Sequence, residues 1–206
     1  MWYWRDEDFS VLVEVSRLAS INSAWAEYAN YCEVLERGLR KDAFNHLSKL
    51  IESSAGWSFS EKKEFVTWLY HYAYPNHFLN QLFPHPLRVK LLEPTLAEWI
   101  CREPDNSEPH RWIGGLAHLK EAVRLNPTDD IACYLLANTI LGHVGYSIHE
   151  LPYGYIGNPK EDLILLEEAE SVMGGISDKE KMSEYQSEIA EIKASIYVYL
   201  TAIAET

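Results

Sequence analysis

Apolar residues recur at intervals of three and four along most of this chain, the spacing that places side chains on one face of an α-helix. The clearest stripe lies near the C-terminus and consists of Met182, Tyr185, Ile189, Ile192, Ile196, Tyr199 and Ile203. Glutamates stand between the members of this stripe. The pattern predicts a long amphipathic C-terminal helix that buries one face, either within its own domain or in a homodimer.

Two further helices are predicted on either side of Asn126-Pro127. Residues 112–123 carry apolar side chains at helical spacing before this break, and residues 131–141 do so after it. Proline disfavours helical conformation in the residue before it, and the aspartates at positions 129 and 130 supply oxygens that can start a helix. The second helix is expected to end at Gly142.

The same reasoning predicts helices over most of the remaining chain. They cover residues 6–19, 23–38, 41–53, 59–74, 95–102 and 161–173. Ser58 and Glu61 form a capping box ahead of one of them, and Pro109 suits the first position of another. No pair of alternating strands is joined by a two-residue turn. The fold class is therefore expected to be all-α, built from antiparallel helical hairpins.

Four prolines between residues 75 and 94 interrupt the helical pattern, with His71, His77 and His85 nearby. Such a run is expected to break the chain into short helical pieces. A length of 206 residues suits one domain. We predict a single all-helical domain over 1–206, which subdivides into N-terminal helices (1–74), a proline-rich junction (75–94) and a third part (95–206).

The segment 116–142 resembles a junction between the helices of a tetratricopeptide repeat. Ala122, Leu125, Asn126 and Pro127 match the pattern that closes one helix of such a repeat. Tyr134, Leu135 and Gly142 fall where the following helix carries a large apolar residue, a packing position and its terminal glycine. The breaks at Pro104 and Pro127 are closer than the usual period of about 34 residues. The resemblance implies a degenerate tetratricopeptide-like array, whose members commonly bind other proteins.

The net charge of −13 is concentrated toward the C-terminus. Residues 1–56 contribute −3, residues 57–125 contribute zero, and residues 126–206 contribute −10. A nucleic-acid partner is not expected, because phosphate backbones require a basic surface. A basic protein would be attracted to the C-terminal portion.

Other features of the sequence indicate the cellular compartment in which the protein is expected. No run of about 18 apolar residues indicates a membrane span, and the acidic N-terminus has no apolar signal core. The three cysteines, Cys32, Cys101 and Cys133, form no CxxC pair and suit buried thiols in a reducing compartment. Together these features predict a cytoplasmic protein with no membrane partner.

Residues 143–159 stand out as a long connection, because helical hairpins usually need only about two to eight linking residues. The segment contains Tyr146, His149, Glu150, Tyr153 and Tyr155. Tyrosines offer flat amphipathic surface to a protein partner, so these five residues form the candidate binding site. The alternative is that the loop packs as a structural plug. Asn158, Pro159 and Glu161 predict the start of the next helix.

Catalytic and metal-binding motifs are not apparent. His149-Glu150 resembles the start of a zinc-protease motif, but Tyr153 stands where the second histidine belongs. His110 and His118 could approach one another, although Gly114-Gly115 lies between them. We therefore predict no catalytic residue, metal or cofactor.

The predicted function is a protein–protein interaction module, an adaptor or scaffold that binds a peptide or helix through a helical groove and the 143–159 loop. One alternative is an acidic, immunity-type protein that neutralises a basic partner. The other is an enzyme whose site includes His143, His149 and Glu150.

Overall fold

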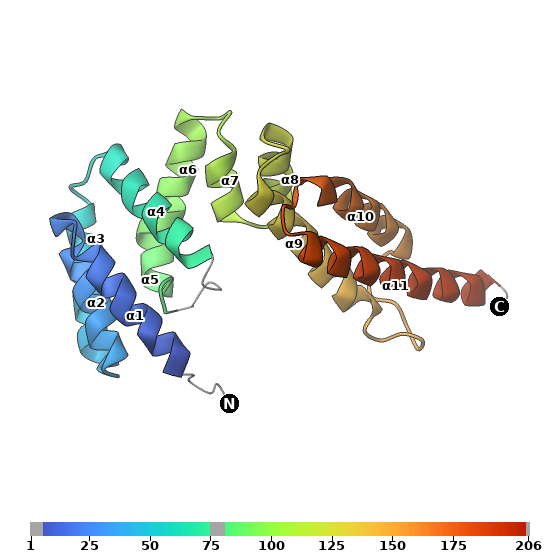
Figure 1. Ribbon diagram of the computed structural model, residues 1–206, viewed down its shortest axis with the longest axis horizontal. Coiled ribbons are helices and arrows are strands. Elements are labelled where there is room, and N and C mark those ends of the chain that lie inside the picture. The colour runs from blue at the N-terminus through green and yellow to red at the C-terminus, as the bar shows by residue number, and fades with distance from the viewer. Residues whose placement is uncertain (1–5, 75–80, 205–206) are drawn as a thin grey trace. The chain divides into compact units, whose positions relative to one another are not determined.

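The computed structural model describes residues 6–74 and 81–204, which Figure 1 shows as helices joined by short connections. No strand occurs within these residues, so the predicted all-α class is confirmed. The chain divides into two compact units, Met1–Arg102 and Glu103–Thr206. The single-domain organisation and the tetratricopeptide-like arrangement of the hairpins stay predictions.

The first unit begins with four helices and ends with one longer helical run. The four helices are α1 (Asp6–Ala19), α2 (Ala26–Glu36), α3 (Arg40–Ser54) and α4 (Phe59–Ala73). The helical run consists of α5 (His85–Leu87), a π-helical segment (Arg88–Leu92) and α6 (Glu93–Arg102). The predicted capping box is confirmed: the Ser58 hydroxyl accepts a hydrogen bond from the Glu61 backbone N–H, and the Glu61 carboxylate accepts one from the Ser58 backbone N–H.

Aromatic side chains fill much of the first unit's core. Trp25 contacts Phe65 and Trp68, with ring centroids 5.5 and 4.8 Å apart. Tyr28 meets Phe65 edge-on at 5.3 Å. Edge-to-face pairs of this kind are favourable because the positive edge of one ring meets the negative face of the other. The high aromatic content of the chain thus serves packing between helices in this unit.

Two buried tyrosine hydroxyls of α2 bind the backbone just before α5. Tyr28 donates to the Leu82 carbonyl oxygen at 2.8 Å, and Tyr31 donates to the Gln81 carbonyl oxygen at 2.6 Å. Burial raises the pKa of both phenols well above the ordinary value, so both remain donors. These bonds fix the segment that leads into α5 against α2.

The predicted fragmentation by proline is wrong for residues 85–102, which form one continuous helical run. Pro86 lies in the first turn, where its missing N–H has no helical partner to lose. Pro94 follows the π-helical segment, in which the Glu93 N–H donates to the Arg88 carbonyl five residues back. The wider π turn accommodates a proline next to it. Pro75 and His77 lie outside the described residues.

The second unit contains α7 (Ser107–Ile113), α8 (Leu116–Leu125), α9 (Asp130–Ile148), α10 (Pro159–Val172) and α11 (Lys179–Ala204). α9 packs against α8, α10 and α11, and α10 packs against α11. Their shared core is formed by buried aliphatic side chains such as Leu136, Ile140, Leu166 and Ile189. The long C-terminal helix is confirmed, with Ile189, Ile192 and Ile196 of its apolar stripe buried.

The predicted helix over 112–123 is wrong, because Gly114 and Gly115 separate α7 from α8. Their φ angles are +71° and +76°, a left-handed region that glycine adopts without steric cost. Pro109 stands third in α7, not first, because Asn106 caps the helix two residues earlier than the sequence suggested.

The predicted end of a helix at Gly142 is also wrong, since α9 continues to Ile148. A glycine inside a helix costs about 1 kcal/mol relative to alanine. Here Leu141 and Val144 are buried on either side of Gly142, and burying each such side chain is worth about 1.5–3 kcal/mol. Packing therefore outweighs the local preference.

By length and composition only, α9 could cross a membrane. Among the helices of the described residues it is the one that meets this criterion. In the structure it lies between α8, α10 and α11, and its residues Leu136, Ala137 and Ile140 are buried in the core of the unit. Core helices of folded domains share this composition. Localisation in the cytoplasm stays a prediction.

Gly175 closes the turn after α10 against the start of α9. A Cβ atom at this position would collide with Cys133 Sγ and would lie 2.9 Å from the Pro127 carbonyl oxygen. A Cβ atom added at the neighbouring Gly174 would have nothing within 4 Å. The close approach of this turn to α9 therefore requires glycine at position 175 but not at position 174.

Candidate functional site

The connection between α9 and α10 is shorter than the sequence predicts. Because α9 ends at Ile148 and α10 begins at Pro159, the connection covers residues 149–158. Tyr146 therefore lies on the last turn of α9 and not in a loop. The predicted start of α10 is confirmed: Asn158 caps the helix through Lys160 N, and Pro159 is its first residue.

The end of the connection nearest α10, here called the loop base, is fixed by partly buried contacts. The Tyr155 hydroxyl donates to Asp162 Oδ2 at 2.7 Å, and the Tyr155 ring stacks on Tyr199 of α11 with centroids 5.6 Å apart. The Ile156 N–H donates to the Ser147 carbonyl at 2.9 Å. Burial, followed by the contact with Asp162, raises the pKa of the Tyr155 phenol, so it stays a donor.

Four of the five predicted site residues take no part in these contacts and are here called the loop tip, which includes the last turn of α9: Tyr146, His149, Glu150 and Tyr153. Tyr146 and His149 stack at 5.1 Å, and His149 Nε2 lies 2.9 Å from Glu150 Oε1. The exposed fraction is 65% for Tyr146 and 96% for Tyr153. The tip thus presents two tyrosines and a carboxylate to solvent, whereas the fifth predicted residue, Tyr155, belongs to the base.

The histidines of the enzyme alternative have separate partners. His143 Nε2 lies 3.5 Å from Asp162 Oδ1, whereas His149 pairs with Glu150. Within residues 6–74 and 81–204, no group of three or more His, Cys, Asp or Glu side chains is arranged to hold a metal ion. His143 therefore lies beside a buried carboxylate, and His149 lies beside an exposed one.

His110 and His118 meet where α8 folds back on α7. The Nδ1 atoms of His110 and His118 lie 3.0 Å apart, so one ring donates its proton to the other. Gly114 and Gly115 make the turn that brings the two rings together. Burial, and next the neighbouring His118, lower the pKa of His110. The sequence placed these histidines near one another but not in contact.

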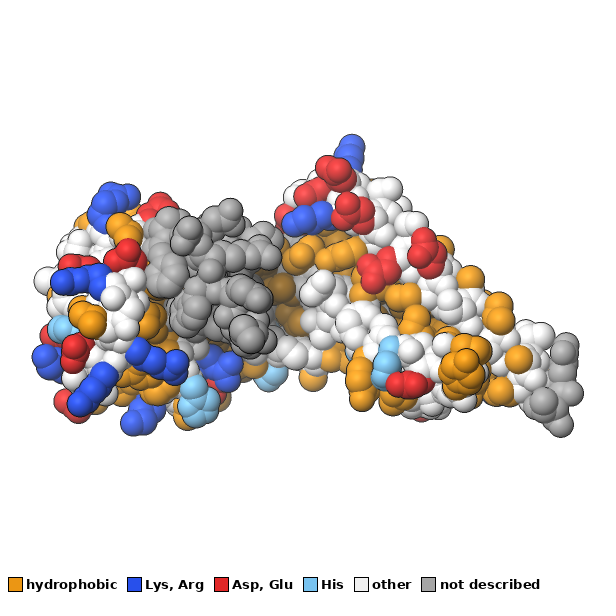
Figure 2. Space-filling view, turned by 90° about the horizontal axis from the view of Figure 1, so that it is seen from below, with side chains coloured by type: hydrophobic (Ala, Val, Ile, Leu, Met, Phe, Trp, Pro, Cys, Tyr) orange, Lys and Arg blue, Asp and Glu red, His pale blue; other side chains and the backbone are white. Residues whose placement is uncertain are grey.

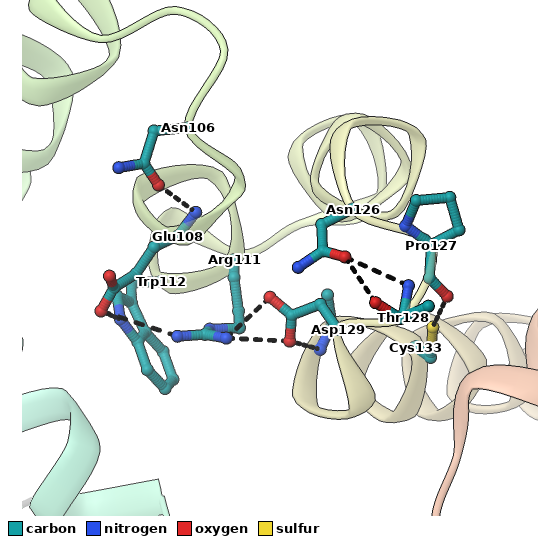
Figure 3. A network of polar contacts seen from close by, with 10 residues as sticks. Asn106, Glu108, Arg111, Trp112, Asn126, Pro127, Thr128, Asp129 and Cys133 are labelled. Atoms are coloured by element: carbon teal, nitrogen blue, oxygen red, sulfur yellow. Dashed lines mark hydrogen bonds and ion pairs between the residues drawn. The ribbon is translucent and has the colours of Figure 1, made fainter.

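A network of polar contacts in the second unit joins α7 to the start of α9 (Figure 3). Arg111 Nη1 donates to both carboxylate oxygens of Asp129, at 2.8 and 2.7 Å. Asp129 also caps α9 by accepting from Ala132 N at 3.0 Å. The guanidinium of Arg111 lies 4.2 Å from the Trp112 ring centroid. Its Nη2 atom lies 3.6 Å from Glu108 Oε1.

This network was not found from the sequence, although Asp129 was predicted to start the helix. Arg111 and Asp129 are nearly covered, with 9% and 6% of their side chains exposed. A partner protein therefore cannot reach them, and the pair serves to hold the helices together. The loop tip is the better candidate for a functional surface.

Comparison with known proteins assigns no family to the chain. No family model matches it, and neither a curated protein nor a solved structure does.

Proposed function

We propose that this chain is a protein–protein interaction module, an adaptor or scaffold that binds a peptide or helix of another protein at the loop tip and the adjoining helical groove. The observation that carries the proposal is the exposure of Tyr146 and Tyr153 on a fixed base. Tyrosine is enriched among the residues that dominate binding energy. A tip held in place loses little conformational entropy on binding, which favours affinity.

The surroundings of the tip suit the same use. Figure 2 views the chain from the side of the 149–158 loop and shows hydrophobic side chains there beside a few acidic ones. Mixed surfaces of this kind, with aromatic residues among polar groups, are typical of interfaces that form between folded proteins. The partner is expected to place an apolar side chain against the tyrosines.

The test compares two double variants of the full chain as bait in lysate capture, with partners quantified by mass spectrometry. Tyr146→Ser/Tyr153→Ser removes both aromatic rings of the tip. Ile21→Ser/Ile164→Ser is the matched control, because it removes two side chains that are 78% and 63% exposed elsewhere. We expect the tip variant to retain its circular dichroism spectrum and to lose its partner by at least about tenfold.

The same capture at about 0.15 and 0.5 M salt separates aromatic from electrostatic binding. A partner held by the tyrosines should persist at high salt. Equal loss in the tip and control variants, or no partner at either salt, would refute the proposal.

A second candidate function is neutralisation of a basic partner by an acidic, immunity-type protein. The observation that favours it is the charge of the second unit, where seven basic and eighteen acidic residues give a net charge of −11. Such a partner would be attracted over long range, and its binding would weaken steeply with salt. A salt-labile partner that survives loss of the tip tyrosines would favour this function over the first.

A further inference from the structure

His149 stands where α9 ends, and its ring lies between two groups that accept hydrogen bonds. His149 Nδ1 lies 2.7 Å from the Tyr146 carbonyl oxygen, and Nε2 lies 2.9 Å from Glu150 Oε1. A carbonyl oxygen and an ionised carboxylate can only accept. A neutral imidazole has one N–H, whereas an imidazolium donates from both ring nitrogens. Both contacts are therefore hydrogen bonds only when His149 carries both protons.

Two further features of this position favour the charged ring. His149 is the C-cap of α9, and the partial negative charge at the C-terminus of a helix attracts a cation. The His149 ring also stacks on Tyr146 with centroids 5.1 Å apart, a distance at which a positive charge is attracted to the face of a tyrosine ring. The carboxylate, the helix end and the aromatic ring thus all interact more favourably with charged His149 than with neutral His149.

Other titratable groups of the second unit have different partners. His143 of α9 lies against Asp162 of α10, and the Tyr155 hydroxyl donates to the same carboxylate. Tyr199 of α11 stacks on Tyr155. In the part of the chain that the structure describes, the titratable groups in contact with the His149 ring are Tyr146 and Glu150. The interactions of His149 are therefore local to the loop tip.

Glu150 connects His149 to the turn that carries Tyr153. The backbone carbonyl of Glu150 accepts from the Tyr153 N–H at 2.9 Å and from the Gly154 N–H at 3.2 Å. The same residue thus contacts the ring at the end of α9 through its side chain and closes the turn through its backbone. When His149 becomes neutral, the Glu150 carboxylate loses its donor, and the turn loses its side-chain anchor.

We propose that His149 is a pH-sensitive switch that fixes the loop tip when it is protonated and loosens it when it is neutral. Histidine changes its charge between about pH 5 and 8. A looser turn makes Tyr153 more mobile, so more conformational entropy is lost when a partner binds. Binding at the tip is therefore tighter at about pH 6 than at about pH 8. This inference rests on the interaction function proposed above and adds its regulation.

NMR spectroscopy of the full chain, labelled with ¹⁵N, tests the switch without a partner. Spectra that correlate ring protons with ring nitrogens report which imidazole nitrogens carry protons, and the His149 signals are identified by their absence in His149→Gln. We expect both nitrogens to be protonated at about pH 5.5 and one at about pH 8.5. The order parameter of the Tyr153 amide should fall over this range, from near the rigid value of about 0.85 toward about 0.6.

Variants identify the contact responsible. His149→Gln and Glu150→Gln each remove one charge of the pair, so each should keep the Tyr153 order parameter at its lower value throughout. His85→Gln is the matched control, because it removes an exposed histidine of the first unit, and it should retain the pH dependence. His118→Gln should retain it too, because the contact between His110 and His118 joins α7 to α8 and not to the tip.

Lysate capture at about pH 6 and pH 8 connects the switch to binding. A partner lost in Tyr146→Ser/Tyr153→Ser should be recovered about two- to fivefold better at the lower pH, and His149→Gln should abolish the difference.

Two results would overturn the proposal. One is a Tyr153 order parameter that does not change with pH, or that changes equally in His149→Gln. The other is a tyrosine-dependent partner recovered equally at both pH values, which would support the interaction function and refute its regulation. A pH-dependent tip without any tyrosine-dependent partner would instead support the switch and refute the interaction function.

Discussion

Replacing Asp129 offers the sharpest test of how the second unit is held together. Its carboxylate has two roles, since it pairs with Arg111 and caps α9 through the Ala132 N–H. Asp129→Ala removes both roles and leaves a buried guanidinium whose nearby carboxylate is that of Glu108, at 3.6 Å. Asp129→Ser removes the charge but keeps a hydroxyl that can cap the helix.

The expected costs follow from these contacts. Removing one partner of a buried ion pair costs about 3–5 kcal/mol, because the remaining charge is left without compensation. Glu108 compensates part of the charge on Arg111, so we expect about 3 kcal/mol for the lost pair, the lower end of that range. A lost cap adds about 1 kcal/mol. Asp129→Ala should therefore cost about 4 kcal/mol of unfolding free energy, and Asp129→Ser about 3 kcal/mol.

The assay is urea denaturation followed by circular dichroism and by tryptophan fluorescence. Six of the seven tryptophans precede residue 103, so fluorescence follows mainly the first unit. The double variant Arg111→Met/Asp129→Ser removes both charges, and it should recover about 2 kcal/mol relative to Asp129→Ser, since replacing a whole buried pair is often nearly neutral. No recovery in the double variant, or equal stability of the alanine and serine variants, would refute the reasoning.

Three other variants test packing and protonation in the second unit. Gly175→Ala should cost about 1–3 kcal/mol in urea denaturation because the added methyl group collides with a buried sulfur, whereas Gly174→Ala should cost less than about 1 kcal/mol and serves as its control. Because the pKa of His110 is lowered in the folded chain, the free energy of unfolding should fall as pH drops below about 6.5. His118→Gln should lessen this fall. Identical pH profiles of unfolding free energy for the variant and the original chain would contradict the coupling between the two histidines. Tyr155→Phe should cost about 1–3 kcal/mol by leaving a buried carboxylate without its donor, and hydrogen exchange in residues 149–158 should become faster.

The helices were predictable from the sequence because their signals are local. The Ser58 capping box and the Asn158 cap each act within three residues of the chain, and the structure bears out both. The stripe of α11 is equally local, since three- and four-residue spacings define the buried side of a helix wherever it packs.

The errors arose where distant contacts or rare backbone conformations decide the outcome. Gly142 has the local signal of a helix end, but α9 continues through it because neighbouring residues are buried in the unit. Tyr153 and Tyr155 are two residues apart and chemically identical, yet Tyr155 meets Asp162 and Tyr199 while Tyr153 is almost fully exposed. Only the fold distinguishes the tyrosine that fixes the loop from the one that faces solvent.

The two hydrogen bonds from tyrosine hydroxyls of α2 to the backbone of residues 81 and 82 affect how the chain folds during synthesis. Tyr28 and Tyr31 are buried, and their acceptors lie about fifty residues further along the chain. Proteins are synthesised from the N-terminus at about 5–20 residues per second. The first helices of a nascent chain therefore hold two phenols without their native acceptors for several seconds, until this later segment has left the ribosome. The first unit can reach its final packing only as a whole.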